Sequence, residues 1–339
     1  MAIAKFRFLG LLILVFSSWS EATESPLLYR PESRGALGDF NPISQYLNLA
    51  FDTAQNPFYF SQDGFFSNHR VLFDRIKSPG AAISESGGVG TFLTEEFFGL
   101  RALPNYTLHL IGGGYDYRLL AEWYAARNYP YPYAIAFFTH YLANIGNEAL
   151  ETTAAQVEPT DHIADLFFFD IVGKLLFLND DFVRFVRDDL GVLVWHFQPM
   201  INLGKFRVDN AGSNYVFRPK WGGEKVRPLV HLGMSILVGA SFALEEEEWL
   251  SFAIGLAPTD PLELKGDLMA GIYYDEGGDL LASLTLNGTS NLLVRLNLYP
   301  DFIRWGDFRP GFFSSVGRQG QFTLGASLVL PIGFSVTAF

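Results

Sequence analysis

The sequence predicts a mainly β protein, namely a transmembrane-type antiparallel β-barrel of ~10–12 strands that carries an inserted helical segment. Three observations favour this fold. Charged residues make up only 18% of the chain and aromatic residues 16%, as strands with one apolar face require. Short runs in the C-terminal part alternate apolar and polar residues. The N-terminus has the pattern of an export signal.

Residues 1–22 are organised like a cleaved secretory signal peptide. Lys5 and Arg7 form a positive region, residues 9–16 form an apolar core, and small residues follow over 17–22. The core is too short to cross a bilayer, which needs ~20 apolar residues. We therefore expect an exported protein and place it in the outer membrane.

Residues 23–116 are predicted to hold an irregular N-terminal segment and the first strands. The best strand candidates are residues 65–76 and 106–111. Residues 112–114 are three glycines between the second candidate and a helix, an arrangement that resembles a phosphate loop. The further glycine spacing and the lysine of such loops are absent, so this motif predicts no phosphate site.

Residues 117–188 predict a helical insertion that plugs or caps the barrel. The expected helices span residues 118–128, 133–157, 160–177 and 181–188. Pro130 and Pro132 separate the first two helices, and Pro159 ends the second, because proline disfavours helix at the residue before it.

The second of these helices carries the strongest candidate site. His140, Asn144, Asn147, Glu148 and Glu151 lie at offsets 0, 4, 7, 8 and 11. At 3.6 residues per turn they occupy an arc of about 100°. The rest of the helix is mainly apolar, so it should be buried with this stripe facing water, a partner helix or a ligand. A structural seam, a metal or ligand site and an acid–base site all remain open.

The third helix adds acidic residues. Asp161 and Asp165 share one face, whereas Asp170 and Lys174 form an i, i+4 pair on the opposite face. Carboxylates near a helix N-terminus are favourable, which gives Asp161 and Asp165 a structural explanation. The functional alternative is that they meet the polar stripe of the second helix across an antiparallel pair.

Residues 189–339 are predicted to form the barrel strands. The strand-like runs are residues 229–244, 250–256, 267–274, 280–286, 292–299 and 322–339. Turn clusters separate them, at residues 275–279 and at Asn287-Gly288. Pro331 is expected to split the last run into two strands.

Two architectures fit this alternation. A β-sandwich has the same period, with its apolar face turned inward. Strands of ~8–11 residues and aromatic residues near the strand ends favour the membrane barrel. The terminal Phe339 supports it less, because it is out of phase with the apolar face of the last run.

Composition excludes several functions. The formal net charge is −12, and without a Lys/Arg cluster nucleic acid is not expected as a partner. The chain has no cysteine, which excludes disulfides and thiolate sites. The acidic run 245–248 is interpreted as a solvated loop, with cation binding as the alternative.

Several short motifs carry a family resemblance. They are Gly112, residues 117–124 (YRLLAEWY), Asn147-Glu148, residues 161–166 (DHIADL), and Trp195 with Gln198-Pro199. Over residues 110–220 the chain resembles an uncharacterised family of bacterial exported proteins. The resemblance implies an envelope protein with a helical motif ahead of its strands, and it supplies no catalytic residues.

The first functional hypothesis is an outer-membrane barrel that is structural, or that binds or passes a small ligand. Its partner would be membrane lipid, and its candidate ligand-binding residues are Asn144, Asn147, Glu151 and Asp161.

The second hypothesis is an envelope hydrolase that modifies lipid or cell-wall material. His140 would be the general base, oriented by Glu148 or Asp165, and a divalent cation is the candidate cofactor.

Overall fold

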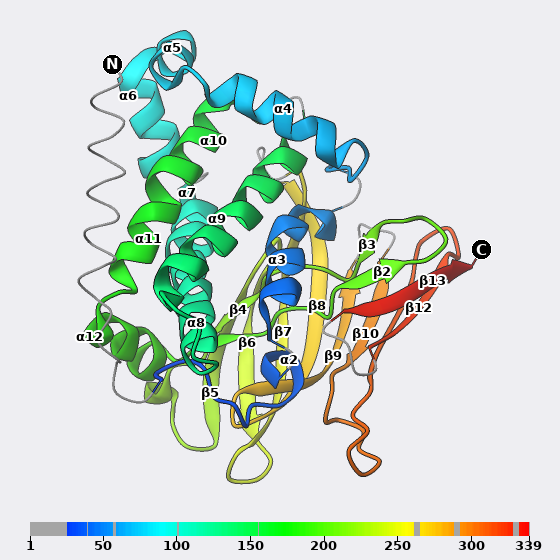
Figure 1. The fold of residues 1–339 in the computed structure, drawn as a ribbon. Helices are drawn as coiled ribbons and strands as arrows, with labels where there is room; N and C mark the ends of the chain where they lie inside the picture. The colour runs from blue at the N-terminus through cyan, green and yellow to red at the C-terminus, as the bar shows by residue number, and fades with distance from the viewer. Residues whose placement is uncertain are drawn as a thin grey trace.

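The computed structural model describes residues 26–338, apart from 39, 57–58, 100–101, 155, 261–264, 288–291 and 328–331. The expected signal segment 1–22, Gly288, Pro331 and Phe339 lie outside the described residues. Of the described residues, 41% are helical and 29% lie in strands, so the fold is mixed helix and sheet rather than mainly β. Helices occupy the first half of the chain and strands the second half (Figure 1).

The N-terminal part is helical where strands were expected. Its elements are α2 Gly35–Gly38, α3 Pro42–Ala50, η1 Asp52–Gln55, α4 Phe65–Ile76, α5 Pro79–Glu85, α6 Gly88–Leu93, η2 Thr94–Phe98, α7 Ala102–Pro104 and η3 Asn105–Gly112. The strands predicted over 65–76 and 106–111 are therefore wrong. On α4, Leu72 and Ile76 are buried together one helical turn apart, a spacing that belongs to a helix.

The helices predicted within 117–188 are confirmed. They are α8 Gly113–Ala125, α9 Pro132–Glu151, α10 Pro159–Ala164, η4 Asp165–Phe169, α11 Asp170–Leu176, α12 Asp180–Arg184 and η5 Phe185–Asp189. They are not an insertion between strands, because the first strand among the described residues begins at Val192. None of the helices in the described ranges is both long and apolar enough to cross a membrane.

The glycines at 112–114 serve helix packing. They lie at the junction of η3 and α8 inside a continuous helical stretch. A Cβ on Gly112 would overlap the ring of Tyr215, and a Cβ on Gly114 would overlap the ring of Phe177. The two glycines therefore let this helix approach the sheet and α11 closely.

The strands form one open sheet. They are β1 Val192–Val194, β2 Met200–Asn202, β3 Val208–Asp209, β4 Tyr215–Phe217, β5 Val226–Leu232, β6 Ile236–Ala243, β7 Glu248–Asp260, β8 Lys265–Glu276, β9 Asp279–Asn287, β10 Val294–Leu298, β11 Gly311–Val316, β12 Phe322–Ser327 and β13 Gly333–Ala338. The sheet has 13 strands in the order β1-β4-β5-β6-β7-β8-β9-β10-β11-β12-β13-β2-β3. From β4 to β13, sequential strands pair in antiparallel fashion.

One predicted strand boundary, the turn between β8 and β9, is confirmed, whereas the expected strand end at Pro258 is wrong. Gly277 and Gly278 adopt φ of 61° and 93° between β8 and β9, which confirms the predicted turn. Strand β7 continues through Pro258, where a strand end was expected. The ladder shifts register between Pro258 and Asp260, which accommodates the missing N–H of proline.

The sheet must curl strongly. Strands β1 and β2 lie eleven strand positions apart in the sheet, yet only residues 195–199 separate them in the chain. Six steps of extended chain reach at most ~21 Å, whereas eleven spacings on a flat sheet cover ~53 Å. The two ends of the sheet therefore approach each other.

A long hairpin crosses between these ends. Residues 210–214 return alongside residues 195–199, and the N–H of Trp195 donates to the carbonyl of Asn214 at 2.9 Å. At one end of the hairpin β4 pairs with β5, and at the other β2 pairs in parallel with β13. The sheet stays open, with β1 and β3 as its edges, so a closed barrel is not confirmed.

The two faces of the sheet are unlike those of a water-soluble sheet. The inner face contacts the crossing hairpin, and there Ser241 and Ser251 are buried and joined by a 2.7 Å hydrogen bond. The outer face exposes apolar side chains, with Val238 57% and Ile254 52% exposed. Other exposed apolar residues of this face are Phe252, Leu268, Ile272, Leu286, Leu296, Phe312, Leu324, Phe334 and Val336. A soluble antiparallel sheet normally turns its apolar face inward.

Candidate functional site

His140, the predicted general base, lies in a closed seam between α9 and α11. Its side chain has no exposed surface, and its Nδ1 lies 3.4 Å from Oδ1 of Asp170. Asn144 donates to the same carboxylate, and Lys174 forms an ion pair with it. The structure therefore pairs His140 with Asp170 and not with the two acids predicted to orient it.

The electrostatic interactions in this seam indicate that it stabilises the fold. Burial by itself raises the pKa of Asp170, but the Lys174 ammonium and His140 hold it at about 2. Burial and the neighbouring Lys174 lower the pKa of His140. A neutral imidazole without access to solvent, packed beside a Lys–Asp pair, stabilises the contact between the two helices.

A second polar group begins at Glu148, eight residues and ~12 Å further along α9. We call it the acid–histidine cluster. Its members are Glu96 from η2, His109 from η3, Glu148 and Glu151 from α9, Asp161 and His162 from α10, and Asp165 from η4. Asp161 and Asp165 thus do meet the polar stripe, at Glu148 and Glu151. Three members lie in π-helical segments, which are frequent at functional sites.

Glu148 is held from behind by His162. Oε2 of Glu148 lies 2.7 Å from Nδ1 of His162, and both side chains are fully buried. On the other side of the ring, Nη1 of Arg75 lies 3.3 Å from Nε2. Because a guanidinium can only donate, Nε2 accepts and Nδ1 carries the proton. Oε1 of Glu148 has no hydrogen-bond partner.

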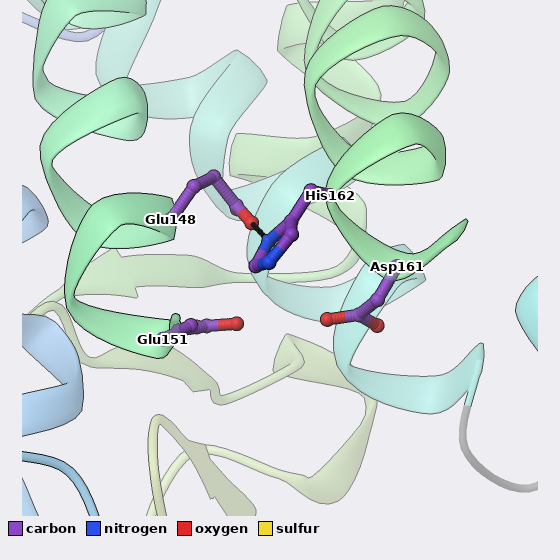
Figure 2. Close-up of side chains that lie close together, drawn as sticks. All are labelled: Glu148, Glu151, Asp161 and His162. Carbon is purple, nitrogen blue, oxygen red and sulfur yellow. Dashed lines mark hydrogen bonds and ion pairs between the residues drawn. The ribbon is translucent and has the colours of Figure 1, made fainter. Parts of the chain in front are cut away.

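Ligand-type atoms converge in two overlapping groups. In the first, one atom each of Glu148, Glu151, Asp161 and His162 lie within 4.8 Å of one another. Figure 2 shows the carboxylates of Glu151 and Asp161 pointing toward each other beside the His162 ring. The second group, within the same limit, consists of His109, Glu148 and Asp165.

The cluster concentrates negative charge. Burial and nearby carboxylates raise the pKa values of Glu151 and Asp165 well above their ordinary range. Burial and Asp161 raise the pKa of Glu96 to about 8. Glu148 and Glu151 also lie in the last turn of α9, where the helix dipole disfavours acidic side chains. Local helix energetics therefore do not explain why acids occupy these positions.

A cavity of about 500 Å³ borders the cluster. Its polar wall includes Glu96, His109, Asn147, Glu151, Asp161 and Asp165. Much of the remainder is apolar, with Leu49, Phe60, Leu108, Val157, Met234, Ile236 and Leu256. Ile236 and Leu256 pair across β6 and β7, and both are about half exposed on the apolar outer face of the sheet. The cavity therefore connects the acid–histidine cluster with that face.

A buried hydrogen-bond network adjoins the same cavity. Asp116 accepts hydrogen bonds from Nε2 of His196 and from the hydroxyl of Tyr215, both at 2.9 Å. Tyr215 and Asp52 line the cavity, and burial raises the pKa of Asp52 to about 7. Asp52 is therefore a further titratable group on the wall of the cavity, outside the acid–histidine cluster.

Sequence reasoning placed four of the seven cluster members among its candidates: Glu148, Glu151, Asp161 and Asp165. His162 was not selected, although the pattern Asp-His-x-x-Asp beside Glu-x-x-Glu matches two facing helix turns. His109 and Glu96 were missed because residues 106–111 were predicted as a strand, and because their partners are 39 or more positions away.

Asn147, a predicted ligand residue, lines the cavity and donates to Oε1 of Glu151 at 3.0 Å. Asn144 instead belongs to the His140 seam. No protein-family model, curated protein or solved structure matches this chain, so its resemblance to exported bacterial proteins stays a prediction.

Proposed function

We propose that this chain is an outer-membrane protein of the bacterial envelope that binds divalent metal at the acid–histidine cluster and acts there on an amphiphilic ligand. The observation that carries the proposal is the position of the cluster. It lies on a cavity that is bordered by Ile236 and Leu256, two residues of the exposed apolar face.

The membrane part of the proposal rests on the exposure pattern of the strands. Alternate positions on β6 and β7 are apolar and exposed on one face, whereas the other face buries Ser241 and Ser251 together with apolar residues such as Leu237. Exposed apolar positions at every second residue are what strands that face lipid outward require. The curled sheet with its crossing hairpin would then be a barrel-like body whose outer face contacts lipid.

The proposal of a metal site rests on the negative charge of the cluster and on two buried carboxylate oxygens that have no hydrogen-bond partner. Oε1 of Glu148 and Oδ1 of Asp165 are buried acceptors without a hydrogen-bond partner. An unsatisfied buried acceptor costs ~1–3 kcal/mol, and more when it is charged. Carboxylates and imidazole without thiolate suit Mn²⁺, Fe²⁺ or Zn²⁺. A cation at this position would satisfy both oxygens and neutralise the neighbouring acids.

Hydrolysis is the reaction class that these groups support best. A bound divalent ion lowers the pKa of a coordinated water and polarises an ester or phosphoester oxygen. Asp52, with a pKa of about 7, is suited to accept or return a proton at neutral pH. The apolar wall would hold the acyl part of the ligand, with its polar head toward the cluster.

The test uses the full-length protein purified in detergent. Metal is removed with a chelator, Mn²⁺, Fe²⁺ or Zn²⁺ is added back, and bound metal is measured by mass spectrometry. Turnover is followed in mixed micelles that contain phosphatidylethanolamine. We expect metal-dependent release of a lipid fragment, lost in Glu151→Gln and retained in the surface control Glu246→Gln.

Protein that retains no metal would refute the proposed site. Metal binding without turnover on any lipid would refute the hydrolase and leave the binding or passage of a small ligand as the function.

A further inference from the structure

We infer that the acid–histidine cluster is a dinuclear centre, in which two divalent ions share Glu148 as a bridging carboxylate. This inference rests on the proposed metal site and deepens it. The first ion would be held by Glu148, Glu151 and Asp161. The second ion would be held by Glu148, Asp165 and His109.

The overlap of the two ligand groups is the geometric basis. Each group gathers its ligand atoms within 4.8 Å, and Glu148 is the member that both groups share. Two ligands at ~2.0–2.2 Å from a tetrahedral ion lie ~3.4 Å apart. Side-chain rotations of about an ångström would therefore bring the atoms of each group to distances that hold an ion.

The orientation of Glu148 suits a bridge. His162 donates to Oε2 from behind and is in turn contacted by Arg75. Oε1 is buried without a partner, and so is Oδ1 of Asp165 in the second group. Carboxylate ligands are commonly fixed by such hydrogen bonds to residues behind them. His162 is thus a positioning residue for the shared ligand.

Charge balance favours two ions over one. The cluster has five carboxylates, those of Glu96, Glu148, Glu151, Asp161 and Asp165, and one nearby guanidinium, that of Arg75. With all acids ionised, four negative charges remain. One divalent ion would leave two of them uncompensated in a largely buried site, whereas two divalent ions match them.

The resulting centre would have open coordination positions at which a reaction could take place. Each ion would have three protein ligands, which leaves positions for water and for a ligand entering from the cavity. Helical bundles build such paired sites from inward-facing Glu, Asp and His on neighbouring helices. Two ions ~3.5–4 Å apart would stabilise both the attacking and the leaving oxygen of a hydrolysed ester.

The decisive measurement is the number of ions per chain. Chelator-stripped protein in detergent is loaded with Mn²⁺, freed of unbound metal, and analysed by mass spectrometry and by electron paramagnetic resonance. We expect two Mn²⁺ per chain and a weak, spin-coupled signal. Glu151→Gln and His109→Gln should each retain one Mn²⁺ with the six-line signal of an isolated ion.

The bridging variant and a control complete the experiment. Glu148→Gln removes the shared charge at constant size and should lower the content to one Mn²⁺ or none, with helicity unchanged by circular dichroism. Glu158→Gln, which changes a cavity acid outside both groups, should retain two. One uncoupled Mn²⁺ in the unaltered protein would overturn the dinuclear centre and leave the proposed metal site intact, whereas no bound Mn²⁺, Fe²⁺ or Zn²⁺ would overturn both.

Discussion

Nδ1 of His162 donates a hydrogen bond to Oε2 of Glu148 over 2.7 Å, between two side chains that have no exposed surface. Arg75 donates to the other nitrogen of the ring, which fixes the orientation of the imidazole. The Glu148 carboxylate is therefore held in one orientation before any ligand arrives, with its second oxygen turned to the cluster.

Replacing His162 by Ala should weaken metal binding without removing a required ligand. Loss of a hydrogen bond that orients a ligand typically lowers metal affinity ~10–100-fold. Isothermal titration with Mn²⁺ measures the change, and His162→Gln should recover part of the affinity because its amide can also donate. His69→Ala, which changes a half-buried histidine of α4 that contacts Phe65, is the control and should bind as the unaltered protein does. Equal affinity in His162→Ala and the control would contradict the positioning role.

The metal-free protein should lose stability as the pH rises. An unfolded glutamate titrates near 4.5, whereas burial and Asp161 raise the pKa of folded Glu96 to about 8. Between these values the folded chain binds more protons than the unfolded chain, so the free energy of unfolding falls with increasing pH. Burial also raises the pKa values of Glu151 and Asp165, which acts in the same direction.

Thermal unfolding at pH 5 and pH 8, with chelator or with Mn²⁺, tests this expectation. With chelator, the midpoint should be lower at pH 8. With Mn²⁺ the trend should reverse, because the metal binds ionised carboxylates and competes with their protons. If the metal-free protein is more stable at pH 8 than at pH 5, the carboxylates of the cluster do not hold extra protons in the folded state.

Replacing His140 by Ala should affect stability and leave the metal site unchanged. The ring is fully buried and contacts Asp170 and Asn144, and its removal leaves a cavity beside a charged pair. We expect a loss of ~2–4 kcal/mol in the free energy of unfolding. Mn²⁺ content and turnover per folded molecule should match the unaltered protein. A folded variant without turnover would restore His140 as the general base.

A substitution at Ile254 tests whether the outer face of the sheet contacts lipid or water. If that face contacts lipid, Ile254→Arg should destabilise the folded, inserted state by ~2–4 kcal/mol near the bilayer centre. On a face exposed to water the same change would be neutral or improve solubility. Folding into lipid vesicles under a urea titration measures the difference. Ile254→Ala is the control, and it should cost much less than the Arg variant in lipid.

Local patterns predicted part of this structure. Strands β7 to β10 and the turn at Gly277-Gly278 followed from alternation and turn residues, because these signals act between near neighbours in the chain. The predicted run 229–244 is instead divided into β5 and β6, and β11 was not predicted. The buried stripe on α9 followed from its helical period. The same reasoning failed over residues 65–76, where a short apolar run fits either period and tertiary packing decides.

The candidate site could be predicted only in part, for a related reason. Glu148 and Glu151 lie close in sequence to Asp161 and Asp165, so a turn between two helices brings them together. His109 reaches these acids only through the tertiary packing of η3, and no local sequence periodicity predicts that packing. The sequence also placed His140 in the same stripe as Glu148, because a helical projection ignores the ~12 Å between them along the axis.

The parallel pairing of Met200–Asn202 with Gly333–Ser335 bears on the order of assembly. Strand β2 is synthesised 133 residues before its partner β13, so the crossing hairpin cannot complete its ladder while the chain is still emerging. The helices and the metal ligands they carry are made earlier still, and they can meet before the last strand arrives. Completion of the sheet thus depends on a late, non-local contact, the kind of step that is slow in β-rich topologies.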